Sequence, residues 1–457
     1  MINKELLKEI IVSNEEFILN QVKGIIKREG IIFPDFPDSL DAPENKRLNL
    51  HKVVILYGVR RSGKTYILYD LFKKYKDRAL YIDFEDERLA DFETKDFERL
   101  KEAFLELKSR FAGANGGEAK EKEVVFLFDE IQNIKGWERF CRRITERENI
   151  KVFVSGSSSR MMPLEIHTSL RGRAWSIEVT PFSFREYLSL KGMDIKDKNI
   201  IYGSKKALVK KHFSEYIKWG GFPEVSLLKS DFEKRKVIKE YFEAMFFKDL
   251  VERFNISNIP LLKMLTERLF SSFSTKFSLT AFYKQYKEKL PFSKDTLFSY
   301  YHYFLESMLI FEARKFAESS YKRLRNPAKI YLVDTGICKK ITSVDWGRIL
   351  ENIVFCQLRR KGEEIFYFEE KKECDFITKD EQGKLFPCQV TWELKEENKE
   401  REIKGLVEAC QKLNVKEGVL FTYDEEGSEI AEGINIKITP VWKWLLKEQS
   451  IGSLVDR

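Results

Sequence analysis

The chain has 457 residues, of which 43% are apolar and 34% charged, and its formal net charge is +8. This length exceeds one ordinary domain and predicts roughly two to four domains. No stretch approaches the ~20 consecutive apolar residues of a membrane span, and the N-terminus lacks a signal-peptide pattern. We therefore expect a cytoplasmic protein without a membrane partner. Its six cysteines include no C-x-x-C pair, which argues against a zinc site.

Charge is unevenly distributed along the chain. Residues 1–204 carry 36 basic and 34 acidic side chains, which is net +2. Residues 205–345 carry 27 and 16, net +11, and residues 346–457 carry 18 and 23, net −5. The middle of the chain is therefore where a polyanionic partner is expected. A solvated lysine-rich surface is the alternative that charge alone leaves open.

The first 180 residues predict a lead-in segment followed by an α/β sheet. Residues 1–50 show amphipathic helical patterning through about Lys27, and then a proline-containing connector. Residues 51–180 alternate short apolar strands with helices, which is the pattern of a parallel sheet covered by helices.

The stretch from Gly58 to Thr65 fits G-x-x-x-x-G-K-[ST], the phosphate-binding loop of P-loop NTPases. An apolar, β-rich run precedes it and a helical pattern follows it, which is the order that this chemistry requires. We expect Lys64 to reach the β and γ phosphates of ATP and the Thr65 hydroxyl to ligate Mg²⁺. The expected nucleotide contacts are Gly58, Arg60, Arg61, Ser62, Gly63, Lys64, Thr65 and Tyr66.

A second apolar run, residues 124–128, ends in Asp129 and Glu130. A buried strand that ends in two acids is the second half of an NTPase site. Asp129 is expected to hold Mg²⁺, and Glu130 to orient or deprotonate the attacking water. Alone this signal is weak, because strands often end in charged turns. Its position after the loop, with one strand between, strengthens it.

Two later stretches are further candidates. A strand around Val152–Val154 runs into a serine-rich tip, where Ser157 could sense the γ phosphate, although an ordinary Ser/Gly turn fits equally well. Arg171 and Arg173 flank a glycine and are candidate arginine fingers, because guanidinium groups stabilise developing phosphoryl charge. They could act in cis or across a subunit interface, and structural ion pairs are the alternative.

Together these stretches resemble one known family. The resemblance rests on the loop from Gly58 to Thr65 and on the strand ends Phe84-Glu85-Asp86 and Asp129-Glu130-Ile131-Gln132. Ser155-Gly156-Ser157-Ser158, Leu170-Arg171-Gly172-Arg173 and Gly220-Gly221-Phe222-Pro223 add to it. The chain resembles the archaeal and bacterial AAA+-like ATPases that carry a DUF4143-type C-terminal region. The resemblance implies an α/β, multidomain protein with an ATPase module, a helical lid, a winged-helix domain and a restriction-endonuclease-like C-terminal domain.

Residues 181–255 have helical patterning, which the turn at Gly220-Gly221 breaks. We expect them to form the lid that closes on nucleotide.

Residues 256–345 predict a winged helix-turn-helix. Its expected elements are helices at 259–273 and 279–289, a third helix capped by Ser293, a strand at 309–311, a basic hairpin tip at 321–327 and a strand at 329–334. Lys294 on the third helix and Lys322, Arg323 and Arg325 at the tip are candidates for binding double-stranded DNA. A winged helix that contacts protein or another subunit of a homo-oligomer is the alternative.

Residues 346–457 place an acid on a helix, Glu351, an acid on a strand, Asp375, and Gln389 with Thr391 on the next strand. This order is that of PD-(D/E)xK nucleases, in which carboxylates bind Mg²⁺ and a lysine polarises the attack. Here the lysine position holds threonine, and glutamine is a poorer ligand than glutamate. We therefore expect a nuclease-like fold that has lost catalysis.

The leading hypothesis is an ATPase that binds and hydrolyses ATP with Mg²⁺ and couples its nucleotide state to DNA or to another subunit. An ATP-gated, metal-dependent DNA nuclease is a second hypothesis. A slow nucleotide switch without significant turnover is a third.

Overall fold

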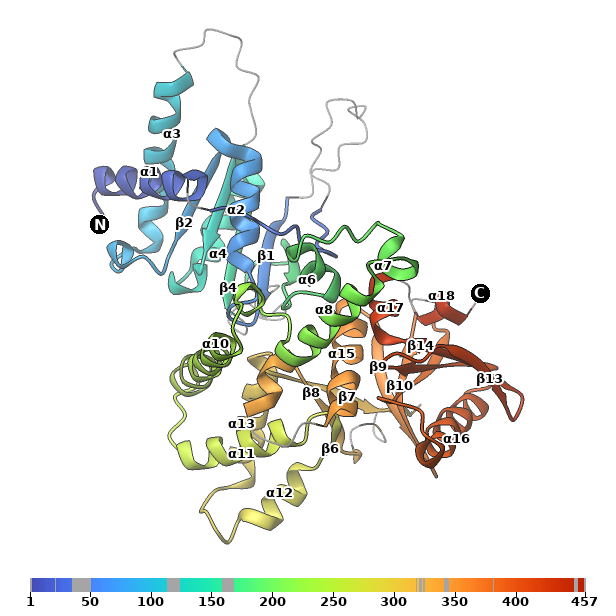
Figure 1. Cartoon of the computed structure of the whole chain (residues 1–457). Helices are drawn as coiled ribbons and strands as arrows, with labels where there is room; N and C mark the ends of the chain where they lie inside the picture. The colour runs from blue at the N-terminus through green and yellow to red at the C-terminus, as the bar shows by residue number, and fades with distance from the viewer. Residues whose placement is uncertain are drawn as a thin grey trace. The chain divides into compact units, whose positions relative to one another are not determined.

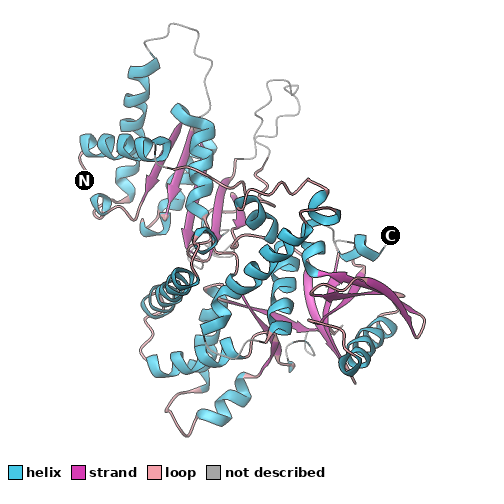
Figure 2. Ribbon diagram, viewed as in Figure 1, coloured by secondary structure: helices cyan, strands magenta, loops and turns pink. Residues whose placement is uncertain are grey.

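The computed structural model of the chain (Figure 1) forms two compact units, Met1–Val179 and Thr180–Arg457. Both units mix helices and strands, as Figure 2 shows. None of the helices in the described part of the chain has the length and apolar character to cross a membrane. The structure describes residues 2–20, 22–34, 51–112, 124–157, 168–317, 319, 323, 325–340, 345–380, 382–447 and 451–455.

The first unit is built on a parallel five-stranded sheet with the strand order β2-β3-β4-β1-β5. Every neighbouring pair in this sheet is parallel, which confirms the predicted P-loop NTPase-like α/β architecture. Parallel strands end at the same edge, so the carboxyl ends of β1 and β3 lie at one edge of the sheet. The strands are β1 (Val53–Gly58), β2 (Ala79–Asp83), β3 (Val125–Asp129), β4 (Lys151–Ser157) and β5 (Ala174–Glu178).

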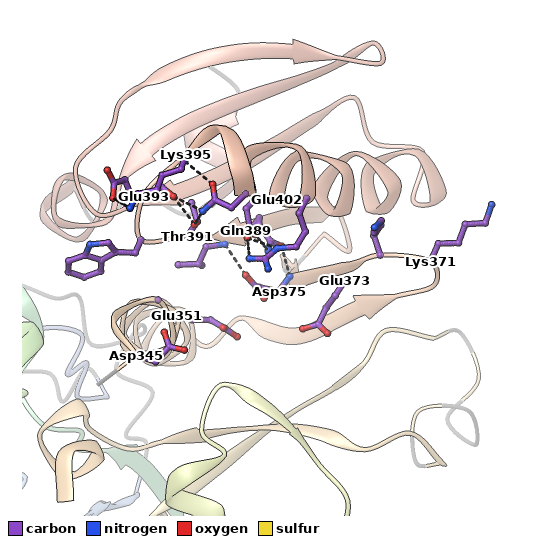
Figure 3. Close-up of a pocket in the computed structure, with 16 residues that line it drawn as sticks. Asp345, Glu351, Lys371, Glu373, Asp375, Gln389, Thr391, Glu393, Lys395 and Glu402 are labelled. Atoms are coloured by element: carbon purple, nitrogen blue, oxygen red, sulfur yellow. Dashed lines mark hydrogen bonds and ion pairs between the residues drawn. The ribbon is translucent and has the colours of Figure 1, made fainter. Parts of the chain in front are cut away.

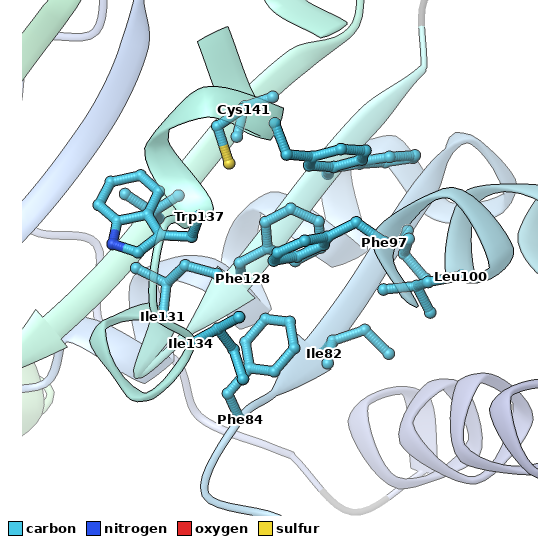
Figure 4. Packing of buried hydrophobic residues seen from close by; sticks show 14 of the residues in the cluster. Ile82, Phe84, Phe97, Leu100, Phe128, Ile131, Ile134, Trp137 and Cys141 are labelled. Atoms are coloured by element: carbon cyan, nitrogen blue, oxygen red, sulfur yellow. The ribbon is translucent and has the colours of Figure 1, made fainter. Parts of the chain in front are cut away.

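Helices cover both faces of this sheet, which is why its strands are apolar without alternation. Val53 and Ile55 belong to a core with α1, α3 and α4, whereas Val54 and Leu56 belong to a core with α2. Figure 4 shows aromatic rings packed in the first of these cores, where Phe97 is fully buried. The helices are α1 (Lys4–Asn20), α2 (Lys64–Tyr75), α3 (Phe97–Ala112) and α4 (Trp137–Arg147), with short 3₁₀ turns at Lys76–Arg78, Glu87–Leu89, Thr94–Asp96 and Ile131–Asn133.

The N-terminal helix is shorter than its apolar pattern predicts. Helix α1 ends at Asn20 instead of continuing to about Lys27. Gly24 has φ 66°, a left-handed conformation that a helix cannot contain and that glycine adopts without strain. Residues 22–34 therefore run as a non-helical segment of the first unit.

The helices between residues 184 and 252 belong to the second unit and pack against its later elements. The Phe213 ring stacks on Tyr423 with centroids 5.8 Å apart, and Arg185 Nη1 donates a hydrogen bond of 2.9 Å to the Leu446 carbonyl. Their role as a lid over nucleotide stays a prediction. They are α6 (Phe184–Leu190), α7 (Asn199–Tyr202), α8 (Lys206–Trp219), α9 (Pro223–Leu227), α10 (Asp231–Ala244) and a π-helix, η7 (Met245–Glu252).

The Gly220-Gly221 turn after α8 is held by a buried carboxylate. Asp334 accepts hydrogen bonds of 2.7 Å from the backbone N–H groups of Gly221 and Gly336. Gly220 has φ 75°, and a Cβ on it would lie 1.8 Å from Asp334 Oδ1. Burial raises the pKa of Asp334 to about 6. The turn thus needs glycine because a side chain there would collide with the group that holds it.

The middle of the second unit contains the three helices and two strands that the sequence predicts there. Ser293 caps the third helix as expected, since its hydroxyl accepts a 3.0 Å hydrogen bond from the Thr296 N–H. A further strand, β6, pairs antiparallel with β8, which also pairs antiparallel with β7. The elements are α11 (Ile259–Ser271), β6 (Thr275–Phe277), α12 (Leu279–Tyr286), α13 (Lys294–Glu306), β7 (Ile310–Lys315), β8 (Ala328–Leu332) and the 3₁₀ segment η8 (Thr335–Lys340).

The C-terminal strands continue the same sheet. Strand β7 pairs in parallel with β9, so one nine-stranded sheet runs in the order β13-β14-β12-β11-β10-β9-β7-β8-β6. The expected boundary at residue 345 therefore separates strands of a single sheet. The remaining elements are α15 (Trp346–Arg360), β9 (Glu364–Glu369), β10 (Glu373–Lys379), β11 (Leu385–Val390), α16 (Glu396–Lys412), β12 (Glu417–Thr422), β13 (Gly427–Ala431), β14 (Ile434–Pro440), α17 (Val441–Lys447) and α18 (Ile451–Val455).

Candidate functional sites

The loop between β1 and α2 begins at a glycine that the fold requires. Gly58 has φ 146°, and a Cβ on it would lie 2.2 Å from the Val179 carbonyl oxygen. The chain then turns through Arg61, at φ 64°, into helix α2, which begins at Lys64. The first N–H groups of a helix have no acceptor within the helix and point toward the loop. The loop thus presents backbone donors together with the positive end of the α2 dipole.

Lys64 is buried inside this loop and is held by backbone oxygen atoms. Its Nζ donates hydrogen bonds of 3.0 Å to the carbonyls of Gly58 and Val59. The Ser62 hydroxyl is also buried and has no hydrogen-bond partner among the described residues. An anionic phosphate group fits this loop. It would accept a hydrogen bond from the Ser62 hydroxyl and give the buried Lys64 ammonium a charged acceptor.

Asp129, at the end of β3, is a buried acid that accepts hydrogen bonds from hydroxyl groups. Its Oδ2 accepts a 3.1 Å hydrogen bond from the Tyr81 hydroxyl, and its Oδ1 accepts one from the Ser155 hydroxyl. Burial raises the pKa of Asp129, and the charge of Glu130 adds to that rise. The nearby Thr65 hydroxyl acts to lower the pKa of Asp129. The Asp129 carboxylate and the Thr65 hydroxyl are oxygen ligands, and Glu130 adds a second negative charge beside them. This set suits a hard divalent cation such as Mg²⁺.

Glu130 follows Asp129 in a strained backbone conformation. Its φ is 48°, a left-handed value that costs about 1–2 kcal/mol for a residue with a Cβ. Gln132 Nε2 donates a hydrogen bond to Glu130 Oε2, and Asn133 Nδ2 donates one of 3.2 Å to the Phe84 carbonyl. The short 3₁₀ turn after β3 therefore fixes the direction of the Glu130 carboxylate.

Asp83 is a third acid at this edge, which the motifs did not single out. It ends β2 and lies directly opposite Asp129 in the strand register. Burial raises the pKa of Asp83 to about 6, and the charges of Asp129, Glu85 and Glu130 add to the rise. The parallel register is the signal that could have found it, because equal positions on neighbouring strands meet at one edge.

The remaining predicted nucleotide contacts lie around the loop. Arg60 forms an ion pair of 3.6 Å with Glu85, and Arg61 and Tyr66 are exposed. Ser157 lies beside Gly58 in the register of β4 and β1, although it is Ser155 whose hydroxyl reaches Asp129. From the N-terminal segment, Arg28 Nη1 donates a 2.7 Å hydrogen bond to the Ser62 carbonyl, a contact that no motif indicates.

Arg171 and Arg173 lie at the other edge of the sheet. They precede β5, and the Arg173 carbonyl accepts a 2.8 Å hydrogen bond from the Val53 N–H at the start of β1. The six residues of β1 separate this edge from the loop by roughly 17 Å. Arg173 Nε also pairs with Glu146 at 2.9 Å. The structure therefore does not bring these arginines to the nucleotide loop of their own chain, and a role in cis is not supported by their position.

The second unit contains a pocket of about 650 Å³ (Figure 3). Glu351 of α15, Asp375 of β10, Gln389 of β11 and Thr391 all line it. The four residues that the sequence pattern grouped as a nuclease-like centre thus lie around one pocket. Thr391 Oγ1 donates to the Glu393 carbonyl at 3.3 Å, which is a structural contact at the position where nucleases of this type have lysine.

A lysine does approach the carboxylates of this pocket, but from another strand. Lys329 of β8 is buried, and its Nζ lies 2.8 Å from Asp375 Oδ1 and 3.1 Å from Glu351 Oε1. It also lies 2.7 Å from Glu373 Oε1. Glu351, Glu373 and Asp375 are called the carboxylate cluster below. Lys329 could have been found only from the strand order, because β8 and β10 belong to the same sheet. The order of motifs along the chain does not reveal this.

The predicted DNA-contact residues are only partly described. Lys294 begins α13, with its Nζ 5.6 Å from the Phe298 ring. Arg323 stacks over Phe366 at 5.8 Å, and Arg325 is exposed. Lys322 lies outside the described residues.

Three stretches of the chain match family models. An AAA domain (AAA_14) covers residues 50–188, a domain of unknown function (DUF8612) covers residues 210–347, and a second (DUF4143) covers residues 346–444. "Uncharacterized protein MJ1544" of Methanocaldococcus jannaschii is 35% identical to this chain, and the match covers 98% of the chain and 96% of that relative.

The chain belongs to the AAA+-like P-loop ATPase family with a DUF4143 region. Another relative, an "Uncharacterized protein" of Haemophilus influenzae, is 27% identical, and the match covers 76% of this chain and 84% of the relative. Among solved structures, "The walker-type atpase paby2304 of pyrococcus abyssi" matches 63% of this chain and 89% of its own length, with 15% identity and a TM-score of 0.37.

The two sites fall in different parts of this AAA+-like, DUF4143-containing protein. The loop from Gly58 to Thr65 and the acids at 129 and 130 lie within the AAA domain. Glu351, Glu373 and Asp375 lie within the DUF4143 match, whereas Lys329 lies within the preceding DUF8612 match. The C-terminal pocket is thus completed by a residue from a neighbouring family segment.

Proposed function

We propose that this AAA+-like protein binds and hydrolyses ATP with Mg²⁺. The observation that carries the proposal is the convergence of Lys64 and Asp129 on one sheet edge, where Lys64 is held by loop carbonyls and Asp129 by hydroxyl groups, next to Thr65. A loop with a buried ammonium, beside a strand-end acid pair, is the arrangement that holds a nucleotide triphosphate and its metal.

Each residue has a role that its contacts support. Lys64 exchanges its two carbonyl acceptors in the loop for phosphate oxygen atoms, because charged acceptors make stronger hydrogen bonds than neutral carbonyls. Thr65 and Asp129 would hold Mg²⁺, which when bound supplies charge neutralisation at the phosphates. Glu130 orients the attacking water or takes its proton, and Gln132 holds the Glu130 carboxylate in place.

Phosphate release and nucleotide binding in a lysine variant test this proposal. Lys64→Ala should abolish ATP binding, measured by calorimetry, and with it phosphate release. Lys74→Ala is the matched control, because Lys74 is an exposed lysine on the same helix. Full turnover in Lys64→Ala would contradict the proposal. ATP binding by the wild-type protein without measurable phosphate release would favour the slow nucleotide switch instead.

We also infer that the segment α11–β6–α12–α13–β7–β8 is a winged helix and couples the nucleotide state to double-stranded DNA. The order of three helices and three antiparallel strands supports this inference, as does the net charge of +11 over residues 205–345. If DNA binding is electrostatic, its affinity falls steeply with salt. Contact with protein, or with another copy of the chain, is the outcome if no DNA binds at low salt.

Charge neutralisation at the expected tip tests the DNA inference. Replacing Lys322, Arg323 and Arg325 with alanine should weaken DNA binding and lower the slope of log affinity against log salt. The control replaces Lys229, Lys236 and Lys239, which are exposed and equal in number. Equal losses in the two triple variants would show a general charge effect and contradict binding at the wing. Stimulation of ATP turnover by DNA would connect the two activities.

Arg171 and Arg173 lie at the edge of the sheet opposite the nucleotide loop of their own chain. We propose for them a role at the nucleotide of another copy, across a subunit interface, supported by their exposure and by their place at this edge. Mixing Lys64→Ala with Arg171→Ala/Arg173→Ala should restore turnover, since one copy supplies the arginines and the other the intact nucleotide site. No gain over the separate variants would contradict this role.

A further inference from the structure

The lysine behind the carboxylates of the C-terminal pocket is bonded to all three members of the carboxylate cluster. Lys329 Nζ lies 2.7 to 3.1 Å from oxygen atoms of Glu351, Glu373 and Asp375, and only 2% of its side chain is exposed. These are buried hydrogen bonds from a charged donor, which are strong and exacting in geometry. The ammonium therefore occupies a position between acids in which nucleases of this type bind a divalent ion.

Several of the oxygen atoms that a metal would use have donors besides Lys329. Asp375 Oδ2 accepts a 3.0 Å hydrogen bond from the Val390 N–H. Glu351 Oε1 accepts a second bond, of 2.7 Å, from the Tyr331 hydroxyl. Gln389 Oε1 accepts from the Asp375 N–H at 2.9 Å. A metal ion would therefore have to displace protein donors from Asp375, from Oε1 of Glu351 and from the glutamine at the third ligand position.

Gln389 is oriented by the protein as a bridge between acids. While its oxygen accepts from the Asp375 backbone, its Nε2 donates a 2.6 Å hydrogen bond to Glu402 Oε2. Glutamate at this position would place two carboxylates in contact with no proton between them, whereas the amide satisfies both neighbours. The departure from the nuclease pattern at this position thus has a structural use that is unrelated to metal.

Two lysines offset part of the charge of the cluster. Lys276 Nζ lies 2.9 Å from Glu373 Oε2, so Glu373 lies between two ammonium groups, while Arg401 pairs with Glu402. The carboxylates hold the pKa of Lys329 well above its ordinary value against the effect of burial. Figure 3 shows Glu351 and Glu373 on one side of the pocket, across from Thr391 and Glu402, with Asp375 next to Gln389. With these cations in place, a further divalent charge would be repelled by Lys329.

We propose that Lys329 is the resident cation of this pocket, that it takes the place of the divalent metal ion of metal-dependent nucleases, and that the pocket functions without a metal. The residues present do not fit the metal that a nuclease-like fold implies. Two features distinguish this role from that of a displaced catalytic lysine. Lys329 is not among the residues that line the pocket in the described part of the chain, and its ammonium is bonded to the acids that would have to hold the metal. The proposal is independent of ATP hydrolysis in the first unit.

Mn²⁺ titration of the full-length, nucleotide-free protein tests this proposal. In calorimetry, wild type and Asp375→Asn should give the same heats, because no Mn²⁺ site depends on Asp375. Lys329→Met should gain an Asp375-dependent site, at least tenfold tighter than any in wild type, which disappears in Lys329→Met/Asp375→Asn. Lys276→Met is the matched control, since it removes a lysine from the same cluster at its exposed side, and it should gain no such site.

The outcomes are decisive in both directions. An Mn²⁺ site in wild type that Asp375→Asn removes would overturn the proposal, as would plasmid cleavage with Mn²⁺ that Asp375→Asn abolishes. If Lys329→Met does not fold, the double variant Lys329→Met/Glu351→Gln serves in its place. It removes one of the acids that the loss of Lys329 leaves without a cation. The comparison of wild type with Asp375→Asn decides the matter without either variant. Phosphate release from ATP, measured in parallel, should be unchanged in Asp375→Asn, so failure here is separable from failure of the ATPase proposal.

Discussion

The two sites of this protein use the same residue types and differ in what holds the lysine. In the first unit, Lys64 is bonded to backbone carbonyls of its own loop. In the second, Lys329 is bonded to three side-chain carboxylates from two other elements, α15 and β10. Neutral carbonyls are weak competitors for an ammonium group, whereas carboxylates are strong ones. A buried lysine beside acids can therefore bind a ligand only when the ligand is a better hydrogen-bond acceptor than the groups the lysine already contacts.

The acids differ in the same way. Asp129 is bonded to hydroxyl groups of Tyr81 and Ser155, which can rotate and also act as acceptors. Asp375 is bonded to an ammonium and to a backbone N–H, neither of which can accept. A cation can therefore join the first acid without breaking its surroundings, but must break those of the second.

The largest expected effect is on turnover at the first site. Glu130→Gln keeps the shape of the side chain and removes its basicity, so ATP should still bind while phosphate release falls by about 100-fold or more, as for loss of a general base. Steady-state turnover together with calorimetry would show this. Glu87→Gln, at an exposed acid near the same edge, is the control. Turnover unchanged in Glu130→Gln would mean that the acid pair is structural, as in the second site.

The next largest effect is on stability at the second site. Lys329→Met leaves buried carboxylates without their cation and should lower the stability of the second unit by ~3–5 kcal/mol, measured by urea unfolding. Lys276→Met, at a partly exposed pair, should cost no more than about 1 kcal/mol. Equal losses in the two variants would contradict the central place of Lys329 in the cluster.

A smaller effect is expected for the residue that positions Glu130. Gln132→Ala removes the hydrogen bond to the Glu130 carboxylate and should reduce kcat by less than Glu130→Gln does, with little change in KM for ATP. Gln132→Glu would place two carboxylates in contact and should reduce kcat further than alanine. If both variants keep wild-type kcat, the left-handed turn alone positions Glu130.

A further effect is a change in the pH dependence of stability. Burial, with the charge of Asp375, raises the pKa of Glu351 to about 8 from an ordinary value of 4.5. Between these values the folded state keeps a proton that the unfolded state has released, so the contribution of Glu351 to stability falls as pH rises. Glu351→Gln should therefore flatten the fall in stability between pH 5 and pH 8, as read from urea midpoints. Glu364→Gln, at an exposed acid, should leave the slope as in wild type.

The sequence predicted the features that depend on residues close together in the chain. The loop, its flanking strand and helix, and the acids that end β3 are continuous stretches, so their periodicity and spacing predict them well. The C-terminal order of Glu351, Asp375 and Gln389 likewise predicted residues that share one pocket. The Ser293 cap was predicted because it depends only on the next three residues.

The features that the sequence could not supply depend on strand order. Asp83 and Tyr81 reach Asp129 because β2 is the neighbour of β3, which no local pattern states. Arg171 and Arg173 follow the serine-rich strand in sequence, yet the crossover to β5 carries them to the opposite edge. Lys329 belongs to the segment predicted as a winged helix and reaches the C-terminal pocket only because β7 pairs with β9.

Counting bound Mn²⁺ in the presence of a non-hydrolysable ATP analogue tests the contrast between the two sites most directly. Electron paramagnetic resonance of the full-length protein should find one Mn²⁺ per chain, lost in Asp129→Asn and retained in Asp375→Asn. A second ion that Asp375→Asn removes, or a first ion that Asp129→Asn does not affect, would contradict it.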